Sequence, residues 1–288
     1  MSIVNECMVV NLQIGVWQGY RLDKEASREV TQQAGAASDA ARVNKHLVPK
    51  ETLKPIITSQ GDIRLHFYAN TLPWKDNGDR LLPRRRYMTF IQEHGALVDK
   101  FRAAVEEFVS TTYLTARDQA EFRMGELFKA DDYPPAERLR SRFYARLDID
   151  PVTEAGDFRV QLSQDAADSI RSDMERAMQE RVSRAIGDVW MRLADTLQHF
   201  ATKMADEDAV FRDSTVHNLR EILGVLPDLN FINDPNLERI RGEIEEAIDG
   251  LDPKTLRTDK VERKRAAAET ARIMEDMKGF MTAFGGVS

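Results

Sequence analysis

The sequence predicts a helix-dominated α+β fold with a few short antiparallel strands, two long antiparallel helices and a C-terminal helical bundle. Three observations lead to this class. Apolar and polar residues alternate near the N-terminus, which is typical of a strand with one buried face. Two later stretches place apolar residues every three or four positions, which is typical of long amphipathic helices. The predicted strands are few and interleaved with helices, and no internal repeat is found.

Residues 1–83 are predicted to form an N-terminal α/β segment. Its first strand follows from four apolar residues at alternate positions: Val10, Leu12, Ile14 and Val16. Residues 23–46 are polar and alanine-rich, and they predict a helix that is interrupted at Gly35. Residues 63–68, IRLHFY, alternate again and predict a second strand.

The connection TLPWKDNGDRLLPRRRYMTF, residues 71–90, is predicted to be a rigid passage from sheet to helix. Two prolines and a glycine restrict its backbone: Pro73, Gly78 and Pro83. Trp74 is expected to close the end of a core, with Leu81 and Leu82 packed beneath it. The alternative is an exposed Trp74 that binds a partner.

Residues 84–206 are predicted to contain the two long helices, with a hairpin at about residues 143–162 between them. The first helix has a heptad stripe: Tyr87, Ile91, His94, Val98, Phe101, Val105 and Phe108. His94 is the polar member, and we expect a core histidine or a register device there. The second helix starts at the N-cap candidate Ser163 and has its own stripe: Ile170, Met174, Met178, Val182, Ile186, Val189, Leu193, Leu197, Phe200 and Met204. The matching spacings predict that the two stripes pack on each other.

Residues 207–288 are predicted to be helices packed on the same core. Asp213 or Ser214 is expected to cap a first helix. Asp234 followed by Pro235 predicts the start of a second helix. Its buried positions are Leu237, Ile240, Ile244 and Ile248. A final helix is expected over residues 258–284.

Composition limits the classes of function. The formal net charge is −7, so nucleic acid would be repelled except at a local basic patch. Cys7 is the only cysteine, which excludes an internal disulfide and is typical of a reducing compartment. No secretory leader or membrane span is recognisable. We therefore expect no membrane association and a cytoplasmic location, in a bacterium or a phage-infected cell.

The sequence predicts a non-enzymatic protein without cofactor or metal. It contains neither GxxxxGK[ST] nor a strand followed by GxGxxG, so nucleotide chemistry is not indicated. His217 and Glu221 share a helical face, but no third metal ligand is visible. Cys7 has no neighbouring base that would activate it as a nucleophile. An enzyme of unfamiliar chemistry ranks below the binding functions.

Two arginine clusters are the candidate binding residues, each beside an aromatic residue. The first cluster contains Arg80, Arg84, Arg85 and Arg86, with Trp74 nearby, and the second contains Arg138, Arg140, Arg142 and Arg146, with Tyr144 nearby. Guanidinium groups bind phosphates and aromatic rings stack on bases, a combination suited to single-stranded nucleic acid. The alternative is a structural or oligomeric network in which these arginines pair with the acidic residues of 206–213 and 243–252.

Five stretches carry a family resemblance: VVNLQIGVWQGYRLDKE, TLPWKDNGDRLLP, LFKADDYPP, GDFRV and FRDSTVHNL. Together they resemble an uncharacterised family of phages and mobile elements, a domain of unknown function. Its genes lie near a MoxR-type AAA+ ATPase, a von Willebrand A-domain protein and recombination genes. The resemblance implies a phage or mobile-element source and a partner role beside an AAA+ ATPase, or a recombination accessory. The resemblance does not identify any catalytic residue in this sequence.

Two functions follow as expectations. The first is a non-enzymatic interaction protein that self-associates or acts with an AAA+ ATPase. The alternative is a single-stranded nucleic-acid binding or annealing accessory that uses the two arginine clusters.

Overall fold

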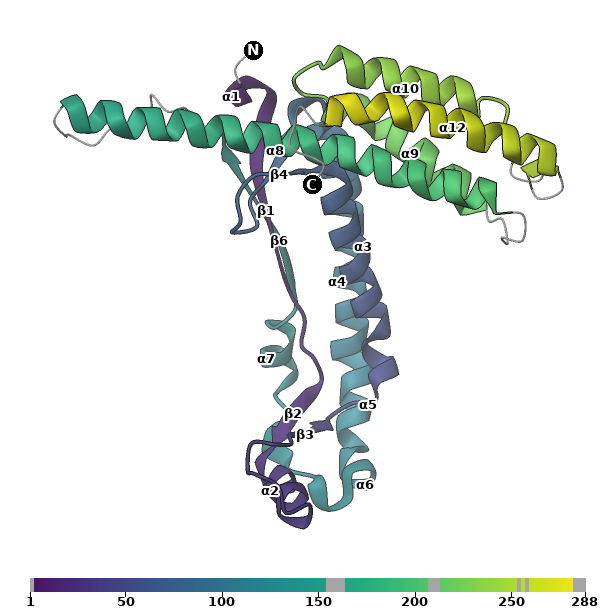
Figure 1. Ribbon diagram of the computed structural model, residues 1–288. Helices are drawn as coiled ribbons and strands as arrows, with labels where there is room; N and C mark the ends of the chain where they lie inside the picture. The colour runs from purple at the N-terminus through teal and green to yellow at the C-terminus, as the bar shows by residue number, and fades with distance from the viewer. Residues whose placement is uncertain (1–2, 154–163, 207–212, 253–254, 257–258, 282–288) are drawn as a thin grey trace. The chain divides into compact units, whose positions relative to one another are not determined.

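The computed structural model describes residues 3–153, 164–206, 213–252, 255–256 and 259–281. It is 70% helical and 12% strand, with a small antiparallel sheet, so the predicted helix-dominated α+β class is confirmed. Figure 1 labels the elements along the chain. They form two compact units, and each unit is built from segments that are far apart in the sequence.

Unit 1 consists of Met1–Asn11, Tyr68–Phe90 and Asp148–Ser288, and unit 2 of Leu12–Phe67 and Ile91–Leu147. This division cuts across the predicted consecutive segments 1–83, 84–206 and 207–288. The chain passes between the units inside four elements: β1 (Cys7–Gly15), α3 (Lys54–Asn70), α4 (Tyr87–Glu107) and β6 (Tyr144–Pro151). A single helix or strand can contribute to two cores, so the order of elements in the sequence does not delimit the units.

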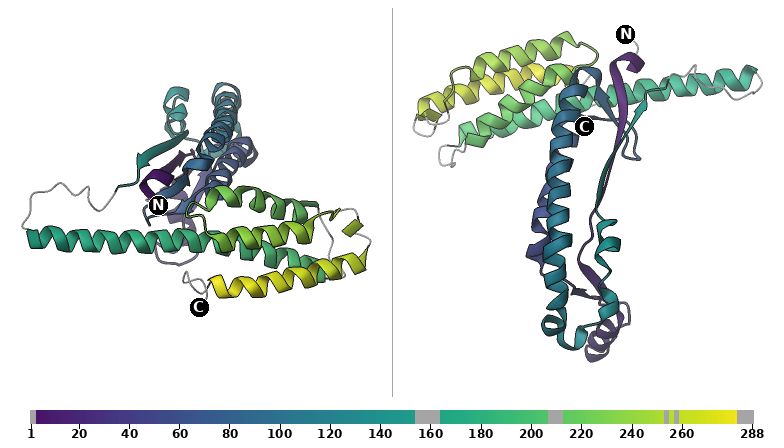
Figure 2. Two further views of the ribbon diagram at one scale, coloured as in Figure 1. Left: turned by 90° about the horizontal axis from the view of Figure 1, so that it is seen from above. Right: turned by 180° about the vertical axis from the view of Figure 1, so that it is seen from behind.

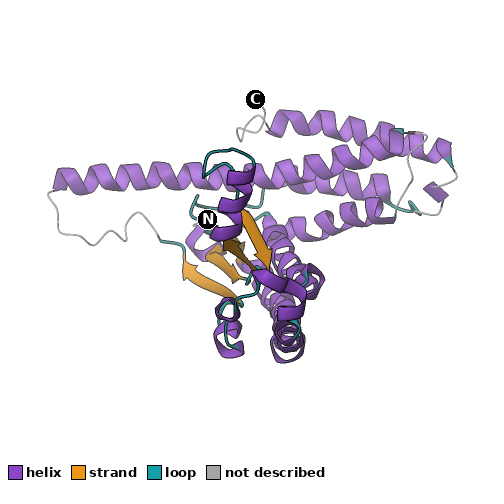
Figure 3. Ribbon diagram, turned by 90° about the horizontal axis from the view of Figure 1, so that it is seen from below, coloured by secondary structure: helices purple, strands orange, loops and turns teal. Residues whose placement is uncertain are grey.

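The larger sheet contains β4 (Leu72–Pro73), β5 (Arg80–Pro83), β1 and β6 in the order β4-β5-β1-β6. Figure 3 shows the strands in orange. Strand β1 pairs antiparallel with β5, placing Cys7 opposite Pro83 and Val10 opposite Arg80. The first predicted strand is therefore confirmed. The first arm of the predicted hairpin forms β6, whereas its second arm and the N-cap candidate Ser163 lie outside the described residues.

A four-helix bundle dominates unit 1. It consists of α8 (Gln164–Ala205), α9 (Asp213–Leu229), α10 (Pro235–Ile248) and α12 (Lys260–Met281). The last three helices lie alongside the C-terminal half of α8, and successive helices run in opposite directions (Figures 1 and 2). The predicted C-terminal helical bundle is thus present, and α8 supplies its fourth helix. A short helix, α1 (Ile3–Glu6), precedes β1.

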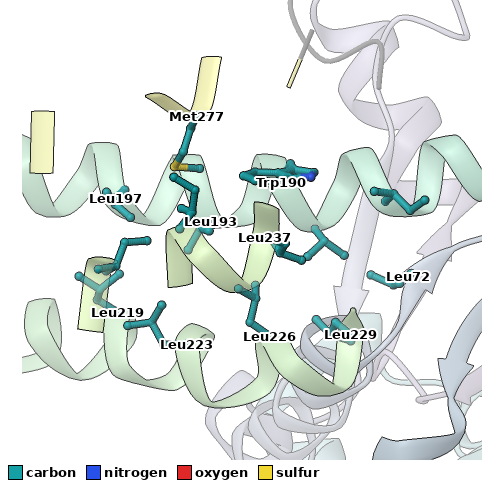
Figure 4. Packing of buried hydrophobic residues seen from close by; sticks show 14 of the residues in the cluster. Leu72, Trp190, Leu193, Leu197, Leu219, Leu223, Leu226, Leu229, Leu237 and Met277 are labelled. Carbon is teal, nitrogen blue, oxygen red and sulfur yellow. The ribbon is translucent and has the colours of Figure 1, made fainter. Parts of the chain in front are cut away.

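Leucines and Trp190 are prominent in the bundle core, together with isoleucine, valine, phenylalanine and methionine side chains (Figure 4). Trp190 is fully buried in α8, and its indole stacks on the ring of Phe280 with the ring centroids 5.7 Å apart. Other members of the same cluster come from all four helices and from β4: Leu193, Leu197, Leu219, Leu223, Leu226, Leu229, Leu237, Met277 and Leu72. Burial of this apolar surface is the main source of stability for the bundle.

The predicted start of α10 is confirmed. The side chain of Asp234 accepts a hydrogen bond from the backbone N–H of Asn236 (2.9 Å), and Pro235 occupies the first turn. This satisfies one of the N–H groups that a helix start leaves unpaired, and the fixed φ of proline suits that position. All four predicted apolar positions of α10 are buried: Leu237, Ile240, Ile244 and Ile248.

Unit 2 contains a pair of antiparallel strands and several helices. The strands are β2 (Tyr20–Asp23) and β3 (Val43–His46), and α2 (Lys24–Gln33) lies between them in the sequence. The other helical segments are Lys50–Leu53, α3, α4, the π-helical segment Phe108–Thr112, α5 (Tyr113–Asp118), α6 (Ala120–Met124), Gly125–Leu127, Ala130–Asp132 and α7 (Ala136–Arg140). The segment Arg84–Arg86 is a 3-10 turn in unit 1.

The predicted strand at residues 63–68 is wrong, because these residues belong to α3. Its buried residues Ile56, Ile63 and Phe67 are separated by seven and four positions, which is helical spacing. Leu65, which a strand would have placed on the same face as Ile63 and Phe67, is 72% exposed. Six residues of alternation also fit two turns of a helix, so the short pattern did not distinguish the two structures.

The predicted helix over residues 23–46 is only partly correct. Helix α2 ends at Gln33, the chain turns at Gly35 with a φ of 62°, and Val43–His46 forms strand β3. Asp23 is the N-cap of α2, and its carboxylate accepts hydrogen bonds from the backbone N–H groups of Glu25 (3.0 Å) and Ala26 (3.1 Å). The tertiary pairing with β2, and not local propensity, therefore determines β3.

Both long apolar stripes are helical, but they are buried in different hydrophobic clusters. Val98, Phe101 and Val105 of α4 belong to the cluster of unit 2, whereas the stripe of α8 is deeply buried from Ile186 onward in the cluster of unit 1. The prediction that these stripes pack on each other is therefore wrong. A spacing of three and four residues shows which face is buried and does not identify the neighbour.

Candidate functional site

The loop between β4 and β5 is held in one conformation by Asp79. Its carbonyl oxygen accepts hydrogen bonds from the backbone N–H groups of Trp74 (3.2 Å) and Lys75 (3.1 Å). Its carboxylate accepts from Nδ2 of Asn11 (3.0 Å) and of Asn77 (3.2 Å). Burial alone would raise the pKa of Asp79, but these hydrogen bonds and nearby Lys75 outweigh it and lower the pKa. The predicted connection therefore contains a hydrogen-bonded turn between β4 and β5, although it follows the helix α3 and not the expected strand.

Trp74 is buried, with 3% of its surface exposed, and packs in the same cluster as Leu72 and Leu81. The guanidinium of Arg181 lies over its ring at 5.7 Å from the centroid. The expected role of Trp74 as the end of a core is therefore confirmed. Its ring is unavailable for stacking on a base or binding a partner in this conformation.

A groove of about 440 Å³ lies beside this loop and α8. Its charged groups are already paired with one another. Asp76 pairs with Arg184 (3.2 Å), Lys75 pairs with Asp79 (3.4 Å), and Arg181 covers Trp74. Of its charged lining residues, only the exposed Glu180 has no partner among the residues that the structure describes, so no cluster of unpaired charge faces the groove.

Arg80, of the first predicted cluster, lies at the C-terminal end of α3. It donates from Nε to the hydroxyl of Thr71 (2.7 Å) and from Nη2 to the carbonyl of Thr71 (2.8 Å). Arg192 of α8, which the sequence reasoning missed, donates to the carbonyls of Thr71 (2.8 Å) and Ala69 (3.2 Å). The end of a helix presents unpaired carbonyls and partial negative charge, so both arginines stabilise α3.

The other arginines of the first cluster also have partners within unit 1. Arg84 pairs with Glu6 (3.4 Å), Arg85 donates to Asn233 (2.8 Å), and Arg86 donates to Asn70 (2.6 Å) and lies 3.8 Å from Asp228. Arg84 and Arg85 are exposed, whereas Arg86 is half-buried. These contacts favour the structural alternative for the first cluster over phosphate binding.

The second cluster lies in unit 2, where α7 leads into β6, and most of its arginines have no partner in the described structure. Arg140 forms a two-bond pair with Glu106 at 2.9 and 3.1 Å. Arg138, Arg142 and Arg146 are exposed, and their side chains make no hydrogen bond or ion pair with any residue that the structure describes. Tyr144 lies among them and is 47% exposed. We call Arg138, Arg142, Tyr144 and Arg146 the arginine patch.

The acidic run at residues 243–252 does not supply partners for either cluster within the described part of the chain. Glu243 pairs with Arg239 of its own helix and with Arg272 of α12, the latter at 3.6 Å. Glu245 pairs with Arg241, also on α10. Within one chain these two acids therefore pair with arginines of α10 and α12 and not with either arginine cluster, whereas pairing between copies stays a prediction.

A buried charge network in unit 2 was not predicted. The ammonium of Lys45 lies 3.1 Å from the carboxylate of Asp23 and 2.5 Å from that of Asp132, and it donates to the carbonyl of Leu127 (3.0 Å). Burial alone would lower the pKa of Lys45, but both carboxylates outweigh it and raise the pKa. Only the position of Asp23 as a helix N-cap could have been read from the sequence, because its partners are far away along the chain.

The histidines fit structural roles. His94 is 5% exposed in the stripe of α4, and its ring centroid lies 6.0 Å from that of His66 in α3. Burial, and then the nearby His66, lower the pKa of His94 from 6.5 to about 4, so it is a neutral core histidine at neutral pH. His217 and Glu221 form an exposed pair at 3.3 Å.

Metal binding and thiol chemistry have little basis in the described residues. They contain no group of three or more His, Cys, Asp or Glu side chains placed to hold a metal ion. Cys7 is buried, and burial, together with nearby Glu6, raises the pKa of its thiol to about 12. Its thiol is therefore protonated at neutral pH.

Among the described helices, none is both long and apolar enough to cross a membrane. Comparison with protein-family models, with curated proteins and with solved structures finds no match to this chain.

Proposed function

We propose that this chain is a non-enzymatic cytoplasmic protein that binds single-stranded nucleic acid at the arginine patch. One observation carries the proposal. Arg138, Arg142 and Arg146 lie within nine residues and have no protein partner in the described structure, whereas every arginine of the first cluster has one.

The chemistry of the patch suits phosphate groups. Each guanidinium presents several N–H donors in a planar fork that matches phosphate oxygens, and it stays charged at any physiological pH. The net charge of −7 makes such binding depend on a local surface, because the protein as a whole repels a polyanion. Exposed arginines without carboxylate partners are such a surface.

The test is a salt titration of affinity for a single-stranded oligonucleotide. In the variant that carries Arg138→Gln, Arg142→Gln and Arg146→Gln, affinity at low salt should fall. Each phosphate contact contributes roughly −0.7 to the slope of log affinity against log salt, so losing three flattens the slope by about 2.

A matched control removes the same charge elsewhere. Arg102, Arg171 and Arg176 are exposed and pair with an aspartate three residues earlier in their own helix. Replacing these three by glutamine should leave the slope close to that of the wild type. The proposal is wrong if the wild type does not bind at low salt, or if both triple variants change the slope equally.

A second candidate function is self-association, and the exposed face of α3 favours it. Ile57 and Leu65 share this face and are 50% and 72% exposed. Gly61 lies midway between them, and a Cβ there would meet no atom within 4 Å. A second copy that packs antiparallel about Gly61 would place Ile57 of each copy against Leu65 of the other, as a two-fold axis requires.

The molar mass in solution tests this candidate. The wild type should sediment as a dimer at micromolar concentration, and Leu65→Lys should shift it to the monomer because a charge would enter the apolar contact. Val261→Lys is the control, since Val261 is an exposed apolar residue of a different helix, α12. A monomeric wild type, or a dimer that survives Leu65→Lys, rejects the α3 interface.

The resemblance to phage and mobile-element proteins implies an AAA+ ATPase as a further partner. Co-purification with a MoxR-type AAA+ ATPase would test that partnership. No residue in the described structure favours a particular docking site for it.

A further inference from the structure

The ring of Tyr144 lies against the backbone of Gly15. A Cβ built on Gly15 would lie 2.2 Å from Cε1 of Tyr144 and 2.7 Å from both Cδ1 and Cζ. These distances fit a point above the ring face, because a point beyond the ring edge would be farther from the two neighbouring atoms. One face of the ring is therefore covered by the strand backbone, where only glycine leaves enough room.

Tyr144 as a whole nevertheless remains 47% exposed, so the contact with Gly15 does not bury it. Tyr144 is the first residue of β6, which lies next to β1 in the sheet. Side chains two positions apart in a strand share a face, so Arg146 lies beside Tyr144, about 7 Å further along β6. An aromatic ring that is supported from behind and flanked by a cation has the composition of a base-stacking site.

We propose that the Tyr144 ring, positioned by Gly15, is a stacking platform that makes the arginine patch prefer single-stranded nucleic acid over duplex. This inference rests on the proposed function and adds the source of its selectivity. A single strand can turn one base onto the ring while Arg142 and Arg146 hold the adjacent phosphates. A duplex offers the same phosphates, but its bases are already stacked on one another.

Gly15 acts here as a positioning residue. A side chain at position 15 would occupy the space of the ring and push Tyr144 out of its place, although no arginine of the patch is changed. A purely structural role for the contact is the competing explanation, since aromatic rings also cover glycines in neighbouring strands. The two explanations differ in what happens to ligand preference.

The experiment measures the affinity of the full chain for a single-stranded oligonucleotide and for its duplex. Tyr144→Ala should weaken binding of the single strand by roughly 5- to 150-fold, the range for one base–aromatic stack, with duplex affinity and salt slope unchanged. Tyr144→Phe should retain wild-type affinity because the ring is kept. Gly15→Ala should reproduce the loss seen in Tyr144→Ala. Gly95→Ala is its control, because a Cβ at Gly95 would meet no atom within 4 Å.

A second readout tests stacking directly in the wild type. An oligonucleotide that contains 2-aminopurine should change its fluorescence on binding to the wild type, because that signal depends on stacking. The change should be smaller with Tyr144→Ala. An unchanged signal with the wild type overturns the platform, even if a variant fails to fold.

The outcomes separate the two proposals. If the triple arginine variant binds as the wild type does, the proposed function itself is wrong. If that variant loses affinity while Tyr144→Ala and Gly15→Ala keep the wild-type preference for single strands, only the stacking platform is wrong. If Tyr144→Ala and Gly15→Ala lower the melting temperature but leave the preference for single strands over duplex unchanged, the contact between Tyr144 and Gly15 serves stability alone.

Discussion

Lys45→Met is expected to lower the free energy of unfolding by roughly 3–5 kcal/mol, because it removes the cation buried between two carboxylates and leaves only the exposed Arg21, 2.8 Å from Asp132, as a counter-charge. Asp23 and Asp132 are both buried, and Lys45 lies 3.1 and 2.5 Å from them. Methionine keeps the length of the side chain, so the lost volume is small and the loss of charge dominates. Urea unfolding of both proteins at neutral pH measures the difference.

Two further variants test the cause of that loss. Adding Asp23→Asn to Lys45→Met should recover part of the stability, because Lys45 is the only cation paired with Asp23 in the described structure and the uncompensated charge is then removed. Lys129→Met breaks an exposed pair with Glu25 and should have little effect. If Lys45→Met costs no more than Lys129→Met, the buried network does not stabilise unit 2.

Acidification from pH 7 to pH 4 is expected to remove about 3 kcal/mol of stability through His94 alone. The pKa of His94 is lowered to about 4 in the folded protein, whereas its ordinary value is 6.5. Between these values the unfolded chain takes up a proton that the folded chain does not. This stability is therefore complete above pH 6.5 and is lost as the pH falls towards 4.

The difference between wild type and His94→Leu isolates this effect from the titration of carboxylates. Leucine suits the buried stripe of α4 and does not titrate. Between pH 7 and pH 4 the free energy of unfolding should therefore fall by about 3 kcal/mol less in the variant than in the wild type. His217→Gln is the control, since His217 is exposed. An equal pH dependence of wild type and His94→Leu would contradict the buried, neutral state of His94.

Several local features of the fold could be predicted because their causes are local. Asp234 and Pro235 start α10 by satisfying an N–H group and by matching φ, and both effects act within one turn. The apolar stripes of α4 and α8 identified the buried faces of both helices. The burial of Trp74 followed from its place between Pro73 and Gly78 beside two leucines.

The same reasoning was wrong where a short pattern fits two structures. The alternation at residues 63–68 fits a strand, but α3 places Ile63 and Phe67 in the core and exposes Leu65. Strand β3 could not be foreseen, because its pairing with β2 joins residues that α2 separates. Pairing across such a distance is a tertiary interaction and has no local signal.

The candidate site shows the same limit. The sequence placed eight arginines in two similar clusters, and composition did not distinguish them. The fold separates them, because the end of α3 binds Arg80 and Asn70 binds Arg86, whereas Arg138, Arg142 and Arg146 have no described partner. Whether an arginine is a cap or a free cation depends on which carbonyl or carboxylate lies within reach.

The sequence by itself determined the helix-dominated class, the buried faces of the long helices, the start of α10 and the burial of Trp74. These features depend on periodicity and on interactions within a few residues. Only the tertiary structure decided which stripe joins which core, the network of Lys45 with Asp23 and Asp132, and the contact of Tyr144 with Gly15. The physical reason is that hydrophobic burial is non-directional and charge pairing acts through space. The local sequence therefore does not identify the partner in either interaction.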